Sequence, residues 1–177
     1  QKVHELRPDK HIIFTEGCME GGPQVGDWRL GERYAESIIK DLNRWTEAWI
    51  DWNLVLNSEG GPNHVGNYCS APVIVDLASQ QVLYQSSFFY IGHFSRYIRP
   101  GARRIACASS RDGLECTAYK NLNGSIIAVV LNQSEEDVKF WLELSGKSAR
   151  TVSPAHSITT FIFPSGVQNS ARGQSRL

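Results

Sequence analysis

The sequence predicts an α/β region over residues 1–99, followed by an all-β region over residues 100–164. Before Pro100, short apolar runs alternate with stretches in which apolar residues recur every three or four positions, as in amphipathic helices. After Pro100, apolar residues recur at every second position in several short segments, which is typical of an antiparallel sandwich. The chain of 177 residues is long enough for two such parts.

The first predicted strand, residues 12–14, leads to Glu16 and a glycine-rich loop. A continuous apolar run of this kind is expected of a strand buried on both faces, and Gly17, Gly21 and Gly22 end it. A carboxylate at the carboxyl end of such a strand lies on the active face of a (β/α)-type barrel. The alternative is that Glu16 pairs with a basic neighbour or caps the next helix.

A helix is predicted from Leu30, because apolar side chains recur on one face at Tyr34, Ile38, Leu42 and Trp45. Its polar face is expected to carry Glu32, Arg33, Glu36, Lys40 and Asp41. The next inner strand is predicted at residues 49–54, and a β-excursion at about residues 57–84, with strands at 73–77 and 82–84. A second helix begins at Ser86 or Ser87, uses Phe88, Ile91, Phe94 and Ile98 as its apolar face, and stops at Pro100.

The all-β region is predicted to contain five strands, at residues 104–108, 114–119, 126–131, 138–144 and 158–163. Asn123-Gly124 is a strong hairpin signal between two of them. Asn123 and Asn132 each begin a glycosylation sequon, which matters only in a secreted eukaryotic chain. The polar stretch 165–177 is expected to be a disordered tail.

Two motifs resemble the glucosylceramidase group of glycoside hydrolase family 30. The first is Thr15-Glu16-Gly17-Cys18, and the second is Asp51-Trp52-Asn53-Leu54, followed by Asn57-Ser58-Glu59-Gly60-Gly61-Pro62-Asn63. They occur in the order found in the C-terminal half of that family. The similarity continues through Gly92-His93-Phe94-Ser95 to Phe161, so it covers nearly the whole chain.

The resemblance implies the C-terminal part of a (β/α)8 TIM barrel with a β-sandwich accessory domain. It implies a retaining β-glycosidase that cleaves a β-glucosidic bond by double displacement, with Glu16 as the nucleophile. The family's acid/base glutamate lies in an Asn-Glu-Pro element, which this sequence does not contain. We therefore expect these residues alone to be inactive, and expect the N-terminal remainder of the barrel to be their partner.

Trp52 and Asn67 match the residues that contact the sugar in the family. An indole ring offers a flat apolar face to a pyranose, and an amide can donate and accept hydrogen bonds. The alternatives are a core aromatic for Trp52 and an ordinary turn residue for Asn67. The other tryptophans are assigned to packing or to the surface, namely Trp28, Trp45, Trp49 and Trp141.

The substrate implied is a β-glucoside or a glucosylceramide-like molecule. The loop over residues 19–24 lacks the aromatic residues of the animal members, and His64 stands in place of a tryptophan. These differences argue against a ceramide aglycone. Other members of the family cleave β-1,6-glucan or β-xylosides, so these two substrates are alternatives.

Composition excludes several other classes. The formal net charge is zero and no basic block occurs, which argues against nucleic acid as a partner, and no apolar run is long enough for a transmembrane segment. The four cysteines lack the spacing of a zinc site, so no metal or cofactor is expected. Free thiols are predicted, and the alternative is a disulfide between Cys107 and Cys116, which lie on predicted neighbouring strands. The sequence starts without a signal peptide, as a piece of a larger protein would, so localisation is not predicted. The alternative function is a noncatalytic β-rich carbohydrate-binding or structural module.

Overall fold

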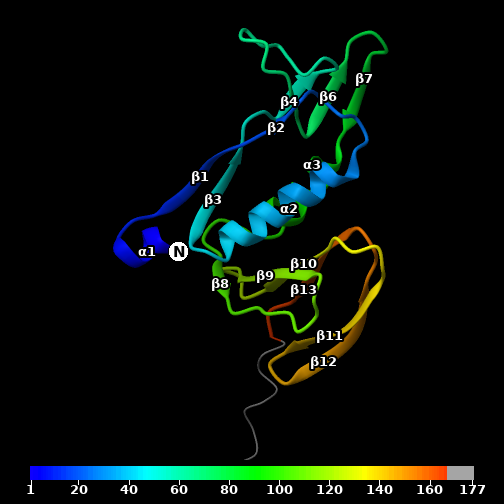
Figure 1. Cartoon of the computed structure of the whole chain (residues 1–177). Coiled ribbons are helices and arrows are strands. Elements are labelled where there is room, and N and C mark those ends of the chain that lie inside the picture. The colour runs from blue at the N-terminus through cyan, green and yellow to red at the C-terminus, as the bar shows by residue number, and fades with distance from the viewer. Residues whose placement is uncertain (167–177) are drawn as a thin grey trace, which may run out of the picture. The chain divides into compact units, whose positions relative to one another are not determined.

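The computed structural model describes residues 1–166, which form two compact units, residues 1–93 and residues 94 onward (Figure 1). The first unit carries α1 (Lys2–Leu6), α2 (Trp28–Leu42), most of α3 (Ser86–Ser95) and seven short strands. The second unit carries β8 (Arg103–Ile105) to β13 (Ser157–Phe163). Residues 167–177 of the expected tail lie outside the described residues, and the domain bounds 1–99 and 100–164 remain predictions.

The first unit is organised around two parallel strands, β1 (Ile12–Gly17) and β3 (Thr46–Asp51), which lie side by side in Figure 1. The predicted strand at 49–54 was therefore placed too late, because pairing with β1 already starts at Thr46. The expectation that residues 12–14 are buried on both faces was also wrong within this chain. Ile13 is 51% exposed; among the described residues β1 pairs with β3 alone, and α2 packs against β3.

The helix α2 begins earlier than the sequence pattern indicated. The Asp27 carboxylate accepts a hydrogen bond from the Arg29 N–H at 3.0 Å and so caps the helix at Trp28. Trp45 lies beyond the end of α2, with a positive φ of 75°, and its ring stacks on His4 of α1. Glu32 was predicted on the polar face but is only 5% exposed, because α2 also packs against Tyr90 of α3.

The β-excursion contains two small sheets. In the first, β4 (Val55–Asn57) pairs parallel with β6 (Val73–Asp76), which pairs antiparallel with β7 (Gln81–Tyr84). In the second, β2 (Met19–Glu20) pairs with β5 (Cys69–Ser70). Leu56, Cys69, Ala71 and Ile74 form a small buried cluster between them. The excursion thus ties the loop that follows β1 to the loop that follows β4.

The helix α3 differs from its prediction in its end and in its buried face. It ends at Ser95, before Pro100, and its deepest side chain is Tyr90 at 0% exposed, whereas Phe88 is 40% exposed. The Ser86 hydroxyl does not cap α3. It accepts from the Gly31 N–H at 3.0 Å and donates to the Asp27 carbonyl at 2.8 Å, so it joins α3 to the start of α2.

The second unit contains a four-stranded antiparallel sheet in the order β13, β10, β9, β8. The central strand β10 (Ile126–Asn132) is buried at every position, and it pairs with β9 (Leu114–Lys120) on one edge and with β13 on the other. The predicted hairpin at Asn123-Gly124 joins β9 to β10, and Gly124 has a positive φ of 83°. The predicted turn is therefore confirmed.

A second hairpin pairs β11 (Val138–Leu144) with β12 (Lys147–Ser153). The sequence prediction missed β12, because most of its residues are polar and exposed. The turn residues Ser145 and Gly146 both have positive φ values, of 51° and 75°, as a two-residue hairpin requires.

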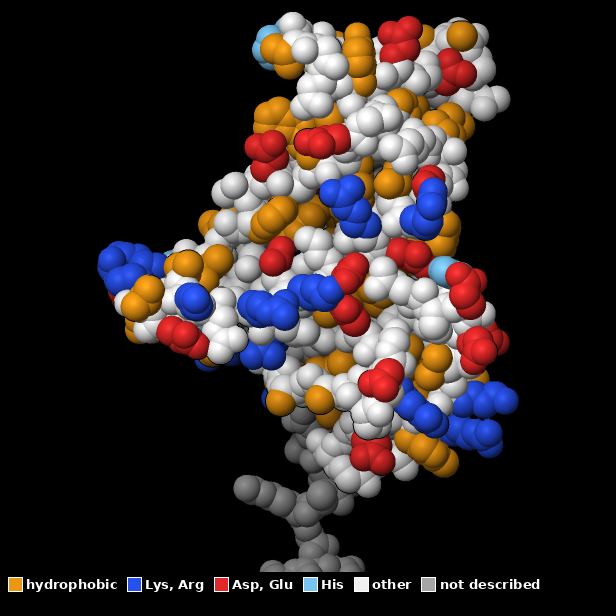
Figure 2. Space-filling view, viewed as in Figure 1, with side chains coloured by type: hydrophobic (Ala, Val, Ile, Leu, Met, Phe, Trp, Pro, Cys, Tyr) orange, Lys and Arg blue, Asp and Glu red, His pale blue; other side chains and the backbone are white. Residues whose placement is uncertain are grey.

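The surface carries both signs of charge. Figure 2 shows Lys and Arg side chains interspersed with Asp and Glu side chains over the face in view, in keeping with a net charge of zero. Within residues 1–166, none of the helices has the length and apolar character needed to cross a membrane.

Candidate active site

The carboxyl ends of β1 and β3 are joined by a backbone hydrogen bond. The Trp52 N–H donates to the Gly17 carbonyl at 2.7 Å, and Gly17 is paired with Asp51 in the parallel register. Glu16 and Trp52 therefore lie at the same end of two adjacent parallel strands. In a parallel α/β sheet this end carries the catalytic and binding residues.

The Glu16 side chain is exposed and makes no hydrogen bond or ion pair with any other residue in the part of the chain that the structure describes. The ion pair or helix cap considered for Glu16 is thus absent from residues 1–166. A carboxylate in this setting keeps its oxygen lone pairs available for a substrate.

Gly17 allows a close approach of the Trp49 ring. A Cβ atom at Gly17 would lie only 2.4 Å from Cη2 of Trp49, so a larger residue would displace the indole. Trp49 is stacked on Phe14 with ring centroids 5.3 Å apart and meets the edge of Tyr34 at 5.0 Å. These contacts fix the backbone directly after Glu16, and Trp49 is a packing residue, as predicted.

Asp51 orients the start of the Trp52 segment. Its Oδ1 accepts from the Tyr34 hydroxyl at 2.6 Å and from the Trp52 N–H at 2.9 Å. Burial raises the pKa of Asp51, and the two hydrogen bonds oppose that shift. Burial and the nearby Asp51 carboxylate raise the pKa of Tyr34, so its hydroxyl remains a donor.

Two buried polar atoms at this end have no hydrogen-bond partner among residues 1–166. They are Oδ2 of Asp51 and Nε1 of Trp49. Buried polar atoms in proteins usually have a hydrogen-bond partner. Oδ2 of Asp51 can therefore accept a hydrogen bond, and Nε1 of Trp49 can donate one, with water, a ligand or further protein as the partner. The sequence analysis placed Tyr34 on the apolar face of a helix. Its hydrogen bond to Asp51 was not predicted, because a helical pattern of apolar residues does not indicate where a hydroxyl group donates.

Asn67 lies in a loop that is shaped by another asparagine. Asn63 Oδ1 accepts from the N–H groups of Val65 and Asn67 at 2.8 and 3.1 Å, and its amide donates to the Asn67 carbonyl. The side-chain amide of Asn67 itself is exposed and makes no hydrogen bond within the described residues. The loop therefore fixes the backbone of Asn67 and leaves its amide accessible.

The Asn67 loop and the Glu16 loop are bound to one another. The Tyr68 carbonyl accepts from the N–H groups of Gly21 and Gly22 at 3.1 and 3.0 Å. The Ser70 hydroxyl donates to the Pro23 carbonyl at 2.6 Å. These bonds extend the β2–β5 pairing and hold the two loops in a fixed relation.

The three predicted site residues therefore belong to one connected set of loops, although no hydrogen bond joins their side chains directly. Trp52 is 58% exposed, which rules out the core aromatic considered for it within this chain. Glu59 is exposed, and its N–H donates to Asn57 Oδ1 at 3.0 Å in the turn after β4, where nothing gives its carboxylate a catalytic role. Among the described residues, no cluster of three or more His, Cys, Asp or Glu side chains could hold a metal ion.

Comparison with known families assigns both parts of the chain. Residues 1–98 match the glycosyl hydrolase family 30 TIM-barrel domain, and residues 101–161 match the family 30 beta sandwich domain. The predicted fold class, the C-terminal part of a TIM barrel followed by a β-sandwich, is confirmed.

Individual relatives extend this result. The chain is 39% identical to mouse lysosomal acid glucosylceramidase over 171 residues, covering 92% of this chain and 33% of the relative. It superposes on the crystal structure of SrfJ from Salmonella typhimurium with a TM-score of 0.87 at 33% identity, covering 92% of this chain and 37% of that one. It superposes on a solved endo-β1,6-glucanase with a TM-score of 0.83 at 27% identity, covering 92% of this chain and 38% of the glucanase chain. The chain thus spans about a third of the length of these relatives.

Proposed function

Since the chain belongs to glycosyl hydrolase family 30, we propose that it forms the nucleophile-bearing part of a retaining β-glycosidase. The observation that carries the proposal is the 2.7 Å hydrogen bond from the Trp52 N–H to the Gly17 carbonyl. It places a free carboxylate and an exposed indole at the same end of adjacent parallel strands. A glycosidase needs both groups there, one to attack the sugar and one to bind it.

In the proposed reaction, Glu16 attacks the anomeric carbon of a β-linked sugar and forms a covalent glycosyl intermediate, which water then hydrolyses. A second carboxyl group protonates the leaving oxygen and must lie about 5–5.5 Å from the nucleophile. We propose that this acid/base glutamate comes from the remainder of the barrel. Glu59 is not proposed for this role because it lies in a turn of the excursion.

The proposed substrate is a β-glucoside. The Trp52 ring would pack on the C–H face of the sugar and the Asn67 amide would bond its hydroxyls. The similarity to mouse lysosomal acid glucosylceramidase supports a β-glucosidic bond and a glucosylceramide-like substrate. The loop differences at residues 19–24 and His64 favour another aglycone, and the relative named an endo-β1,6-glucanase makes a glucan the second candidate.

The exposed apolar residues of the first unit support the proposal that further barrel strands complete it. Ile13 and Ile50 on β1 and β3 are 51% and 49% exposed, and Leu54 is 72% exposed. Apolar strand faces of this kind are normally covered in a barrel. We propose that the N-terminal part of the barrel covers them and brings the acid/base group to Glu16.

The test is hydrolysis of a chromogenic β-glucoside by the natural polypeptide, with Glu16→Gln compared with Glu59→Gln. Loss of the nucleophile is expected to lower kcat by about 10³-fold or more. The control removes a second exposed glutamate of the same unit and is expected to change kcat by less than about threefold. Near-normal hydrolysis by Glu16→Gln would reject the assignment, and sugar binding without hydrolysis by the wild type would favour the noncatalytic module.

A further inference from the structure

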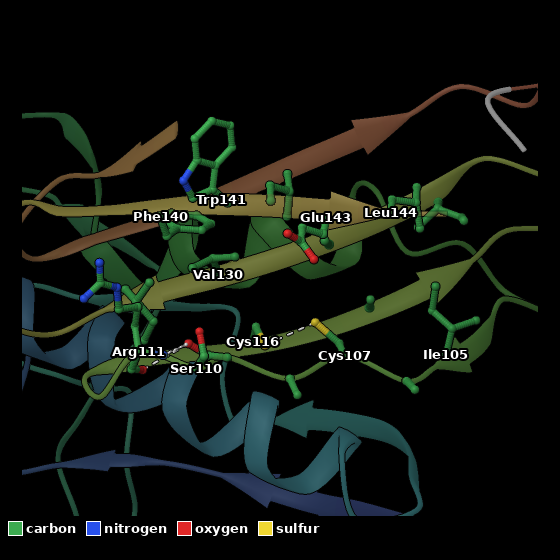
Figure 3. Close-up of a pocket in the computed structure, with 18 of the residues that line it drawn as sticks. Ile105, Cys107, Ser110, Arg111, Cys116, Val130, Phe140, Trp141, Glu143 and Leu144 are labelled. Carbon is green, nitrogen blue, oxygen red and sulfur yellow. Dashed lines mark hydrogen bonds between the residues drawn. The ribbon is translucent and has the colours of Figure 1, made fainter. Parts of the chain in front are cut away.

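A pair of thiols in the second unit lies outside the proposed active site. The Cys107 Sγ donates to the Cys116 Sγ at a separation of 3.1 Å, shown by the dashed line in Figure 3. The two cysteines are thiols and not a disulfide. The antiparallel register of β8 and β9 explains their approach. Arg103 pairs with Lys120 and Ile105 with Ala118, so the same register continued by two residues sets Cys107 opposite Cys116.

The pair is accessible to small molecules. Both cysteines line a cavity of about 830 Å³. Its other walls include Val130, Phe140 and Leu144 (Figure 3). Neither thiol is fully buried. A cavity of this size can admit a small peptide disulfide, because ligand pockets typically measure about 300–1,000 Å³.

We propose that Cys107 and Cys116 form a reversible redox site, which a small disulfide such as oxidised glutathione converts to an intramolecular disulfide. Directly opposed residues in an antiparallel pair have Cβ atoms about 4.5–5.5 Å apart. A disulfide needs about 3.5–4.5 Å between its Cβ atoms, so only a small closure of the two segments is required.

The exchange balances in two steps. The Cys116 thiolate attacks one sulfur of the oxidant, forming a mixed disulfide and releasing one small thiol, which takes up a proton. The Cys107 thiol then loses its proton and attacks the Cys116 sulfur, which releases the second small thiol. Two electrons pass from the cysteine sulfurs to the oxidant, whose own disulfide bond is broken.

The hydrogen bond from the Cys107 thiol to the Cys116 sulfur favours Cys116 as the attacking sulfur. The hydrogen bond from the Cys107 thiol lowers the pKa of Cys116, while the same bond and burial raise the pKa of Cys107. A thiol with a lowered pKa supplies more of the thiolate that performs exchange.

The other close thiol pair is expected to react more slowly. Cys18 and Cys69 have Sγ atoms 3.3 Å apart in the first unit. Burial and the neighbouring thiol raise the pKa of Cys18 to about 12, and Cys69 is only 1% exposed. Because little of the Cys18 thiol is ionised and Cys69 is hardly accessible to an oxidant, this pair serves as an internal comparison.

The experiment is disulfide mapping of the natural polypeptide after incubation with oxidised and reduced glutathione in varied ratios. Free thiols are alkylated and the chain is digested with trypsin, which cleaves after Arg104, Arg111 and Lys120. Cys107 and Cys116 then fall in separate peptides, residues 105–111 and 112–120. We expect these two peptides to become linked as the oxidised fraction rises and to separate again with dithiothreitol.

Single variants define the chemistry. In Cys107→Ser, Cys116 is expected to stop at the mixed disulfide with glutathione, while Cys69→Ser should leave the 105–111 to 112–120 link unchanged. The proposal is overturned if the wild-type peptides stay separate at every ratio, whether alkylated or carrying glutathione. A link from either peptide to Cys18 or Cys69 would also overturn it. The wild-type result decides the matter even if a variant does not fold.

Discussion

The two units of the chain bury their strands to very different extents. In the second unit, β10 is buried at all of its positions and pairs with β9 on one edge and with β13 on the other. In the first unit, β1 pairs only with β3 among residues 1–166, and its Ile13 side chain is half exposed. The central strand of the second unit is therefore paired on both edges and fully buried, whereas β1 of the site-bearing unit has one paired edge among residues 1–166 and is supported by loop hydrogen bonds and ring packing. We expect substitutions in the second unit to act on stability, and substitutions at the strand ends of the first unit to act on catalysis.

The largest stability effect is expected in the second unit, at Asn132. This residue is 0% exposed, and its amide nitrogen donates to the carbonyls of Glu136, Ser153 and Pro154 at 2.8–3.1 Å. Asn132→Asp places a carboxylate against those oxygens and should lower the free energy of unfolding by about 3 kcal/mol or more. Denaturant titration measures the loss.

Asn123→Asp is the matched control for that change. Asn123 is also the first residue of a sequon in a turn, but it is exposed, and within residues 1–166 its side chain accepts only from Ser125. Its unfolding free energy should change by less than about 0.5 kcal/mol. Equal losses in the two variants would contradict the contrast between buried and exposed asparagines.

The next effect concerns sugar binding at the end of β3. Trp52→Ala removes the exposed indole and should lower kcat/KM for a β-glucoside by about 100-fold, near 2.7 kcal/mol. Trp141→Ala is the control, because Trp141 is 63% exposed on β11 of the second unit and lies outside the proposed site. A similar drop in both variants would show that the distinction between the units does not hold for catalysis.

Packing between α2 and α3 of the first unit gives a smaller effect. A Cβ at Gly31 would lie 2.5 Å from Cδ2 of Tyr90, so Gly31→Ala should cost about 1–3 kcal/mol of unfolding free energy. At Gly92, also in α3, a Cβ meets nothing within 4 Å, and Gly92→Ala should stabilise by about 0.5–1 kcal/mol. Thermal unfolding of the pair checks the sign of each change.

The smallest effect is a pH dependence at Asp51. Its folded-state pKa is raised by burial, so its contribution to stability is fully present below the unfolded pKa and is lost as the pH rises through the folded pKa. Asp51→Asn should abolish that decline in unfolding free energy. Hydrogen bonds from Ser79 and Ala78 lower the pKa of Asp76, so its contribution to stability is present above the unfolded pKa and is lost as the pH falls through the folded pKa. Asp76→Asn should remove that loss at low pH. If the unfolding free energy of Asp51→Asn declined with pH as steeply as that of the wild type, Asp51 would not be the source of the decline.

Much of the fold could be predicted from the sequence. The period-two pattern after Pro100 located β9, β10, β11 and β13, and the Asn123-Gly124 turn located their first hairpin. The strand β12 was missed because its outward residues are polar, although the Ser145-Gly146 turn before it was an available signal. Glu32 was misplaced because helical periodicity describes one buried face, whereas α2 also packs against Tyr90.

The candidate site was predicted only through its motifs. The resemblance pointed to Glu16, Trp52 and Asn67, and their roles remain proposals. The supporting contacts were not predicted, because the Tyr34 to Asp51 hydrogen bond joins residues 17 positions apart on a helix and a strand. The approach of the Trp49 ring to Gly17 likewise depends on the β1 to β3 register, which local composition does not fix.

The measurement that tests the central claim most directly is the trapping of the covalent intermediate. The natural polypeptide would be treated with an activated 2-deoxy-2-fluoro-β-glucoside, which slows hydrolysis of the glycosyl-enzyme, and then digested with trypsin. Glu16 falls in the peptide 11–29, and fragmentation separates it from Glu20 and Asp27 in the same peptide. We predict a single fluoroglucosyl adduct on Glu16, while an adduct on any other residue, or turnover without an adduct, would contradict the assignment of Glu16 as the nucleophile.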